Sequence, residues 1–182
     1  TPSQSSAASD VYKRQFHHAV EAYKIADLLA DNNICAALWA DWWGFKHEAY
    51  DMSIANVAIV DQARNGQGCA IVHSDSENGI QRLNQEAAKA LSAGREAGFE
   101  ISDARAITWL TKNPAIAAGI LEQTGTIEIG KNADIVVWSG HPLSVYSKAD
   151  QVYIDGALTF DRLNNFMPHT DFDLGIELWE SE

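Results

Sequence analysis

Hydrophobic residues in the first half of the chain form short continuous runs that alternate with segments of helical period. The apolar runs end near Phe16, at Trp39 and just before Asp75. After each run, apolar residues recur three and four positions apart, the spacing of an amphipathic helix. Alternating apolar strands and helices are typical of a parallel β-sheet. We therefore expect strands ending at 16–18 and covering 34–39 and 68–75, with helices at 22–31, 53–64 and 82–93.

The helical pattern also predicts which residues face the core. Ile25 and Ile54 fall on the apolar faces of the first two helices, and Gly94 should end the third. Two more helices are expected, one capped by Ser102 and one that begins at Asn113 with Pro114 in its first turn.

After Gly125 the pattern changes to short strands, which we expect at 126–129, 134–138, 151–154 and 157–160. The dipeptide Asp155-Gly156 between the last two is a strong hairpin turn signal. The expected organisation is an α/β unit at 16–122, a small β-unit at 123–162 and an acidic tail at 163–182. Residues 1–15 resemble translated adapter sequence, so we expect a non-native, disordered leader there. The start of the chain then says nothing about localisation, and cytoplasm and periplasm both stay open.

Size, charge and cysteine content narrow the function classes. The chain has 182 residues, too few for a complete eight-stranded β/α barrel, which needs about 250. A net charge of −12 argues against binding to nucleic acid or anionic membranes, and no apolar run is long enough to span a bilayer. Cys35 and Cys69 both lie in apolar strand-like runs, and we expect buried free thiols.

Candidate chemistry gathers where the expected strands end. Asp75 follows a buried strand, so its carboxylate should be paired, metal-bound or catalytic, or should cap a helix. His17 and His18 end the first strand, where only one can face the sheet edge, as a metal ligand or a hydrogen-bonded core histidine. His73 should share the face of Asp75 if that strand is regular, and could contact substrate or serve structure alone.

The loop at 41–48 combines aromatic and charged residues. Trp42, Trp43 and Lys46 would form an apolar wall with a cation for a small-molecule substrate. The alternative is simple aromatic packing under a loop.

Three stretches resemble one enzyme family. Residues 18–27 (HAVEAYKIAD) resemble the end of its sixth barrel strand, and 73–75 (HSD) with 82–89 (RLNQEAAK) its eighth strand and following helix. Residues 108–115, 125–140 and 152–156 resemble its last helices and closing β-strands. The chain is thus similar to the C-terminal part of the amidohydrolase superfamily, in its imidazolonepropionase-like and prolidase-like branch.

This resemblance implies a fold and a reaction. The chain would supply about three βα units of a TIM-type (β/α)8 barrel and a small β-sandwich accessory unit. One or two divalent metals, zinc in the first place, would activate water to hydrolyse a C–N bond of an amide, cyclic amide or peptide-like substrate. Asp75 would bind metal and act as general base, and His18 would bind metal or contact substrate.

The same resemblance leaves alternative functions open. The family's other metal ligands would lie on strands before Phe16, so this chain alone should be inactive. A non-catalytic remnant or binding module of the same fold is one alternative, and a deaminase of the same fold is another. Related enzymes are commonly oligomers, which makes a homo-oligomer possible.

Overall fold

A computed structural model of the chain describes residues 15–164. Residues 1–14 of the expected leader and 165–182 of the expected tail lie outside the described residues. The first strand begins at Gln15, one residue before the expected start of the α/β unit.

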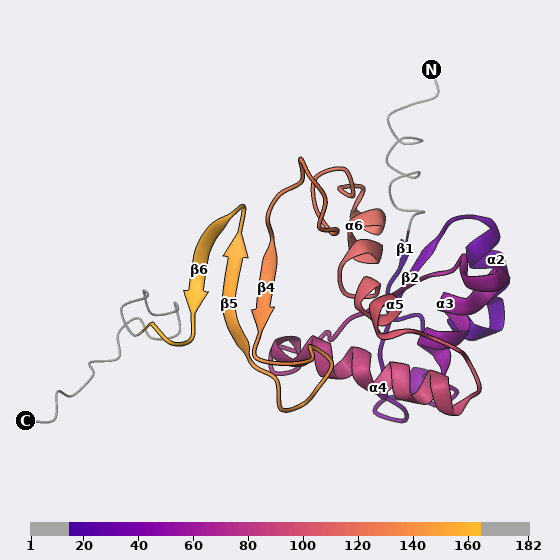
Figure 1. The fold of residues 1–182 in the computed structure, drawn as a ribbon. Helices are drawn as coiled ribbons and strands as arrows, with labels where there is room; N and C mark the ends of the chain where they lie inside the picture. Colours follow the sequence, from indigo (N-terminus) through magenta and orange to yellow (C-terminus); the bar gives the residue numbers. More distant parts are fainter. Residues whose placement is uncertain (1–14, 165–182) are drawn as a thin grey trace, which may run out of the picture.

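Three parallel strands, in the order β1-β2-β3, form the first sheet (Figure 1). In their register Cys35 lies opposite Cys69, and Leu38 opposite Val72. Helical segments follow each strand, as the sequence pattern predicts. The bounds are β1 Gln15–Phe16, η1 Ala22–Ile25, α2 Ala26–Asp31, β2 Cys35–Leu38, η2 His47–Ala49, α3 Asn56–Gly66, β3 Cys69–Val72, η3 Ile80–Arg82 and α4 Leu83–Glu96.

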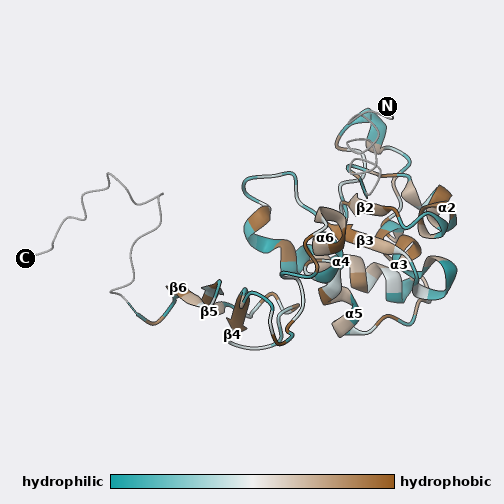
Figure 2. Ribbon diagram, turned by 90° about the horizontal axis from the view of Figure 1, so that it is seen from above, coloured by the Kyte–Doolittle hydropathy of each residue, from teal (hydrophilic) through white to brown (hydrophobic). Residues whose placement is uncertain are grey.

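The two faces of this sheet have different partners. Seen from above in Figure 2, β2 and β3 lie between α3 and the later helix α6 (Lys112–Ala118). On one face Leu38 and Val72 pack in the main core with residues of α2, α3 and α4. On the other face the buried residues are Cys35, Ala37 and Ile71, packed with Ala117 of α6.

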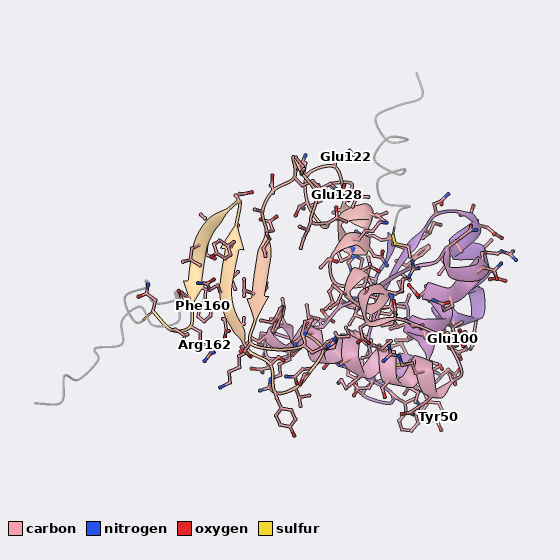
Figure 3. The ribbon with its side chains drawn as sticks, viewed as in Figure 1. Tyr50, Glu100, Glu122, Glu128, Phe160 and Arg162 are labelled. Carbon is pink, nitrogen blue, oxygen red and sulfur yellow. A yellow bond between two sulfur atoms is a disulfide. The ribbon has the colours of Figure 1, made fainter. Side chains whose placement is uncertain are left out.

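The cysteines occupy that second face, and the expectation of free thiols is wrong. Cys35 and Cys69 form a disulfide with their Cα atoms 4.5 Å apart, visible as the yellow bond in Figure 3. The reason is register: the two residues oppose each other on neighbouring strands, so both sulfurs lie on the same face within bonding reach.

Helices α3 and α4 pack closely because of Gly94. A Cβ atom at Gly94 would lie only 2.5 Å from the Cβ of Ala58. The expectation that Gly94 ends the helix is wrong, since α4 continues to Glu96. Ile25 and Ile54, expected in the core, are 47% and 55% exposed. Ile25 belongs to the short η1 turn, and Ile54 precedes the first residue of α3.

A buried carboxylate joins α3 to α5 (Asp103–Thr108). Asp61 is fully buried. Its Oδ1 accepts hydrogen bonds from Arg105 Nε and Trp109 Nε1, both at 2.8 Å. Arg105 also donates to the carbonyl of Gly66 at 2.9 Å, which ties the end of α3 to the same network.

The outer edge of β3 is capped by the segment that follows α5. The amide of Val72 donates to the carbonyl of Trp109 at 3.2 Å. The side-chain amide of Asn113 in α6 donates to the carbonyl of Ala70 at 2.7 Å. The Val72 amide and the Ala70 carbonyl are therefore satisfied without a further strand.

The second sheet is antiparallel, in the order β4-β5-β6, with strands Ile135–Trp138, Ala149–Ile154 and Ala157–Asp161. It lies to one side of the helices, with Phe160 and Arg162 near its outer strand and Glu122 and Glu128 in the connection from α6 (Figure 3). Asp155 and Gly156 form its tight turn with φ angles of 52° and 80°, as the turn signal predicts.

The strand expected at 126–129 does not form. Ile127 and Ile129 in this segment are almost fully exposed, and it pairs with no strand among residues 15–164. The second sheet is tethered to the first unit through the β4–β5 loop. Leu143 of this loop joins the main core, and Asn84 of α4 donates to the carbonyl of Pro142 at 2.7 Å.

Across the described range 15–164, no helix is both long enough and apolar enough to cross a membrane.

Candidate functional site

Aromatic and ionisable side chains meet above the carboxyl ends of all three parallel strands. His18 follows β1, Trp39 follows β2, and His73 and Asp75 follow β3. The rings of Trp39 and His73 stack with centroids 5.5 Å apart. The ring of His18 lies 5.0 Å from Trp39 and 5.1 Å from His73. Because parallel strands end at one edge, residues far apart in sequence converge there.

His18 and Asp75 face each other although β1 and β3 are not neighbours. His18 Nδ1 lies 3.7 Å from Asp75 Oδ2, and their side chains are 44% and 55% exposed. This separation exceeds a hydrogen bond and allows charge attraction when the histidine is protonated. Both residues have a φ of 54°, in the left-handed region that non-glycine residues rarely adopt. Two matching strained residues thus aim their side chains at one point.

We expected Asp75 to end a regular strand, and this expectation is wrong. Strand β3 ends at Val72, so Asp75 comes three residues later, adopts a left-handed conformation itself, and is exposed rather than buried. The alternation argument that put His73 and Asp75 on one face therefore does not apply. Contact across strands, not alternation within one, brings both close to His18.

His73 is half-buried, and its ring lies against those of His18 and Trp39. Its backbone amide donates to the carbonyl of Leu38 at 3.0 Å, which continues the β2–β3 ladder. Burial, and then the nearby imidazoles of His18 and His17, lower the pKa of His73 to about 4, against the opposing effect of Asp75. Its Nε2 is buried without a hydrogen-bond partner among the described residues. At neutral pH the site therefore holds an uncharged imidazole with a free polar atom.

His17 and His18 do not follow the expected rule that only one of them can face the strand ends. Strand β1 ends at Phe16, so the opposite-face rule of a strand does not govern them. The His17 ring lies 6.2 Å from that of His73, and His18 lies closer at 5.1 Å. Among residues 15–164, only His18 of the two pairs with a carboxylate.

The 41–48 loop covers one side of the group. Trp42 stacks on Trp39 with centroids 5.2 Å apart, and Phe45 meets Trp39 edge-on at 5.2 Å. The Lys46 ammonium lies 5.2 Å from the ring centroids of Trp39 and Phe45. Trp43 does not join them and packs beside Tyr50 at 5.8 Å. The structure thus brings Trp42 and Lys46, but not Trp43, to the site.

Sequence reasoning missed two residues of this wall, Trp39 and Phe45. Trp39 could have been identified as a site residue, because it follows β2 directly and lies one position beyond the paired residues Leu38 and Val72. Its indole Nε1 is buried without a partner among the described residues. Phe45 carried no sequence signal beyond its place in an aromatic loop.

A hollow lies elsewhere in the molecule. About 810 Å³ in volume, it runs between α2 and the end of α3 and is lined by Tyr23, Asp31, Arg64 and Phe99 among others. It contains no histidine, and its arginine is paired with Asp31 at 2.6 Å. The chemistry of the chain therefore concentrates at the strand ends and not in this hollow.

His18 and Asp75 fit two positions of a divalent metal site. Two donor atoms on one tetrahedral zinc lie about 3.4 Å apart, because each bond is roughly 2.1 Å long. The His18–Asp75 separation of 3.7 Å is close to this value. No group of three or more His, Cys, Asp or Glu side chains within 15–164 could hold a metal ion. Since a catalytic zinc takes three protein ligands, the pair can serve only as part of a larger ligand set.

Known proteins with similar sequences match between 22% and 81% of the chain. The amidohydrolase family model matches residues 57–164. Amidohydrolase tasK of Hapsidospora irregularis is 32% identical over 153 residues, which cover 81% of this chain and 15% of tasK. Imidazolonepropionase of Brucella suis is 48% identical over 40 residues, 22% of this chain and 10% of that enzyme. The chain therefore spans a small part of the curated relatives that it matches.

Solved structures give a similar result. An amidohydrolase from Thermotoga maritima matches with a TM-score of 0.68 and 32% identity, over 81% of this chain and 37% of that one. An adenosine deaminase from Xanthomonas campestris, solved with bound zinc, has a TM-score of 0.62 at 16% identity over the same shares, a likeness of fold alone. Because the family model covers more than half of the residues, the chain belongs to the amidohydrolase family.

Proposed function

We propose that the intact protein containing this chain is a metal-dependent hydrolase that cleaves a C–N bond of an amide, cyclic amide or peptide-like substrate. Residues 16–122 would supply the last three strand–helix units of a β/α barrel, and 123–162 would supply strands of a β-sandwich. The observation that carries the proposal is the convergence of His18 and Asp75, 3.7 Å apart, at the carboxyl ends of two non-adjacent parallel strands. That edge is where β/α barrels place their catalytic groups.

His18 Nδ1 and Asp75 Oδ2 would hold the metal together with ligands outside the described residues. When bound, a divalent metal such as zinc makes a water molecule more acidic and polarises a carbonyl group. Asp75 is about half exposed, so its carboxylate can reach water and substrate. It would take the proton from the attacking water and deliver it to the nitrogen that leaves.

The remaining residues would position the substrate. Uncharged His73 would contact the substrate beside Asp75 with the accessible part of its half-buried ring, while its Nε2 is enclosed by protein. The indole of Trp42, which stacks on the buried Trp39, would offer its partly exposed apolar face. An apolar wall with a few polar groups is typical of small-molecule sites.

Metal binding and turnover test the proposal in the intact protein. We expect H18N and D75N each to lower zinc content after purification, and D75N to reduce kcat/KM for a peptide or cyclic amide by about a thousandfold. Matched controls are H141N and D51N, which make the same changes at exposed residues outside the group. Wild-type protein that takes up no divalent metal under any loading condition would overturn the proposal in favour of a non-catalytic member of the fold. Release of ammonia from a ring substrate without amide cleavage would favour a deaminase.

A further inference from the structure

Asn56, the first residue of α3, is a buried amide that is only 1% exposed. Its Nδ2 donates to the backbone carbonyls of Ala19 at 3.0 Å and Val20 at 3.1 Å. Its Oδ1 accepts from the backbone amide of Tyr23 at 2.8 Å. A primary amide has two N–H donors, and here both are used on consecutive carbonyls. The side chain of Asn56 therefore binds the backbone that directly follows His18.

The backbone at His18 depends on support of this kind. Strand β1 ends at Phe16, so His18 lies beyond the pairing of β1 with β2. The next bond to β2, from the amide of Ala19 to the carbonyl of Ala37, is long at 3.4 Å. His18 itself has a φ of 54°, which is unfavourable for a residue with a side chain and persists only where surrounding contacts hold it. The bonds from Asn56, one and two residues later, are such contacts.

Asn56 acts on the candidate site through the backbone. Its amide bonds to Ala19 and Val20 and not to the imidazole of His18, so its effect on that imidazole is indirect. The imidazole lies 3.7 Å from Asp75 while the backbone of His18 is left-handed, and a change of φ would swing the side chain away from the carboxylate. An asparagine on a neighbouring helix thus controls where a strand-end histidine points.

We propose that Asn56 is a positioning residue for His18, because its amide holds the turn after β1 in the form that aims the imidazole at Asp75. The expected effect on metal binding rests on the proposed hydrolase function. The expected effect on the separation of His18 and Asp75 rests on geometry alone, so the two proposals can fail separately.

N56D separates hydrogen bonding from packing at this position. Aspartate has nearly the shape of asparagine, but its carboxylate has no N–H donor and would face the carbonyl oxygens of Ala19 and Val20. In the intact protein we expect N56D to raise the zinc dissociation constant, measured by competition with a chelator, about 10–100-fold. The matched control is N84D, which makes the same change where the amide donates to the carbonyl of Pro142, and it should leave zinc binding unchanged.

A double-mutant cycle with H18N distinguishes positioning from a general structural role. If Asn56 acts through His18, N56D should have little further effect on zinc affinity when H18N is already present. Equal losses in the two backgrounds, no loss in either, or an equal loss in N84D would overturn the inference.

Crystal structures of the intact, metal-free wild type and N56D test the geometry without reference to activity. We expect N56D to keep the fold, with His18 at negative φ and its Nδ1 further from Asp75 Oδ2 than the 3.7 Å of wild type. An unmoved His18 would overturn the inference. If N56D does not fold, N56S, which keeps one donor and adds no charge, is measured in the same two ways and should show a smaller change of the same kind. If wild type takes up no zinc, the hydrolase proposal fails, and the position of His18 in the variant still decides whether Asn56 positions it.

Discussion

Trp39 and His73 stack on each other one register step beyond the last paired residues of β2 and β3, with ring centroids 5.5 Å apart. The same register places Cys35 opposite Cys69 four residues earlier, on the same face of the sheet. The disulfide therefore joins the two strands at their start, and the stacked rings lie where the strands end. The geometry of the candidate site depends on the register that this covalent link holds.

Loss of the disulfide should destabilise the protein. The bond closes a loop of 34 residues, and loop-closure entropy gives a stabilisation of about 3–4 kcal/mol at room temperature as an upper estimate. We expect C35A/C69A to lower the free energy of urea unfolding by up to this amount, with little further effect of dithiothreitol. Two titratable thiols in unreduced, denatured wild-type protein would restore the interpretation of free cysteines.

His73 should make stability depend on pH in a defined window. Its pKa is lowered to about 4 from 6.5. Between these values the unfolded chain binds a proton that the folded chain does not. The His73 contribution to the unfolding free energy should therefore fall as the pH drops from 6.5 to 4 and level off below.

NMR of the histidine side chains in the metal-free protein measures the pKa of His73 directly. In urea unfolding at a series of pH values, the free energy of unfolding should decline less in H73Q than in wild type between pH 6.5 and pH 4. A His73 imidazole that titrates at or above pH 6.5 would contradict the prediction.

Asp61 should be far more important for stability than an exposed aspartate in a similar pair. D61N removes the charge that opposes Arg105 and disturbs the hydrogen bonds to Arg105 and Trp109, and we expect a loss of about 3 kcal/mol. The matched control is D31N, whose carboxylate pairs with Arg64 at the surface, where solvent screens the pair, so its loss should change stability little. Thermal or urea unfolding of D61N and D31N measures how much unfolding free energy each variant loses. Equal losses would mean that burial of Asp61 adds nothing.

Gly94 should tolerate no side chain while Ala58 faces it. G94A would place two Cβ atoms 2.5 Å apart, and overpacking of this kind costs about 1–3 kcal/mol. The double variant A58G/G94A should recover much of that loss, because A58G removes the Cβ atom that the new Cβ at position 94 would contact. A G94A variant as stable as wild type would show that α3 and α4 can separate at no cost.

Much of the fold was predictable because its signals are local. The alternation of apolar runs and helical periods gave the three strand–helix units, and Asp155-Gly156 gave the hairpin of the second sheet. The errors arose where a contact between distant segments decides the outcome. Gly94 lies inside its helix, where the missing side chain leaves room for Ala58 of α3. The 126–129 segment has strand composition but lacks a neighbouring strand among the described residues.

The candidate site was predictable in its location but not in its geometry. Residues after apolar strands pointed to His18, His73 and Asp75. The left-handed conformations of His18 and Asp75 have only a weak sequence signal, because Asp and His adopt positive φ more often than most residues but far less often than glycine. Trp39 was overlooked because it reads as the last residue of a buried strand, although register places it beside His73.

The capped edge of β3 has a consequence for how this sheet can grow. The Ala70 carbonyl and the Val72 amide are already hydrogen-bonded. A further strand that pairs with this edge must therefore replace these hydrogen bonds. The Asn113 amide is a side chain that can rotate away, whereas the Trp109 carbonyl belongs to the backbone. Exchange would therefore start at Ala70 and advance towards Val72.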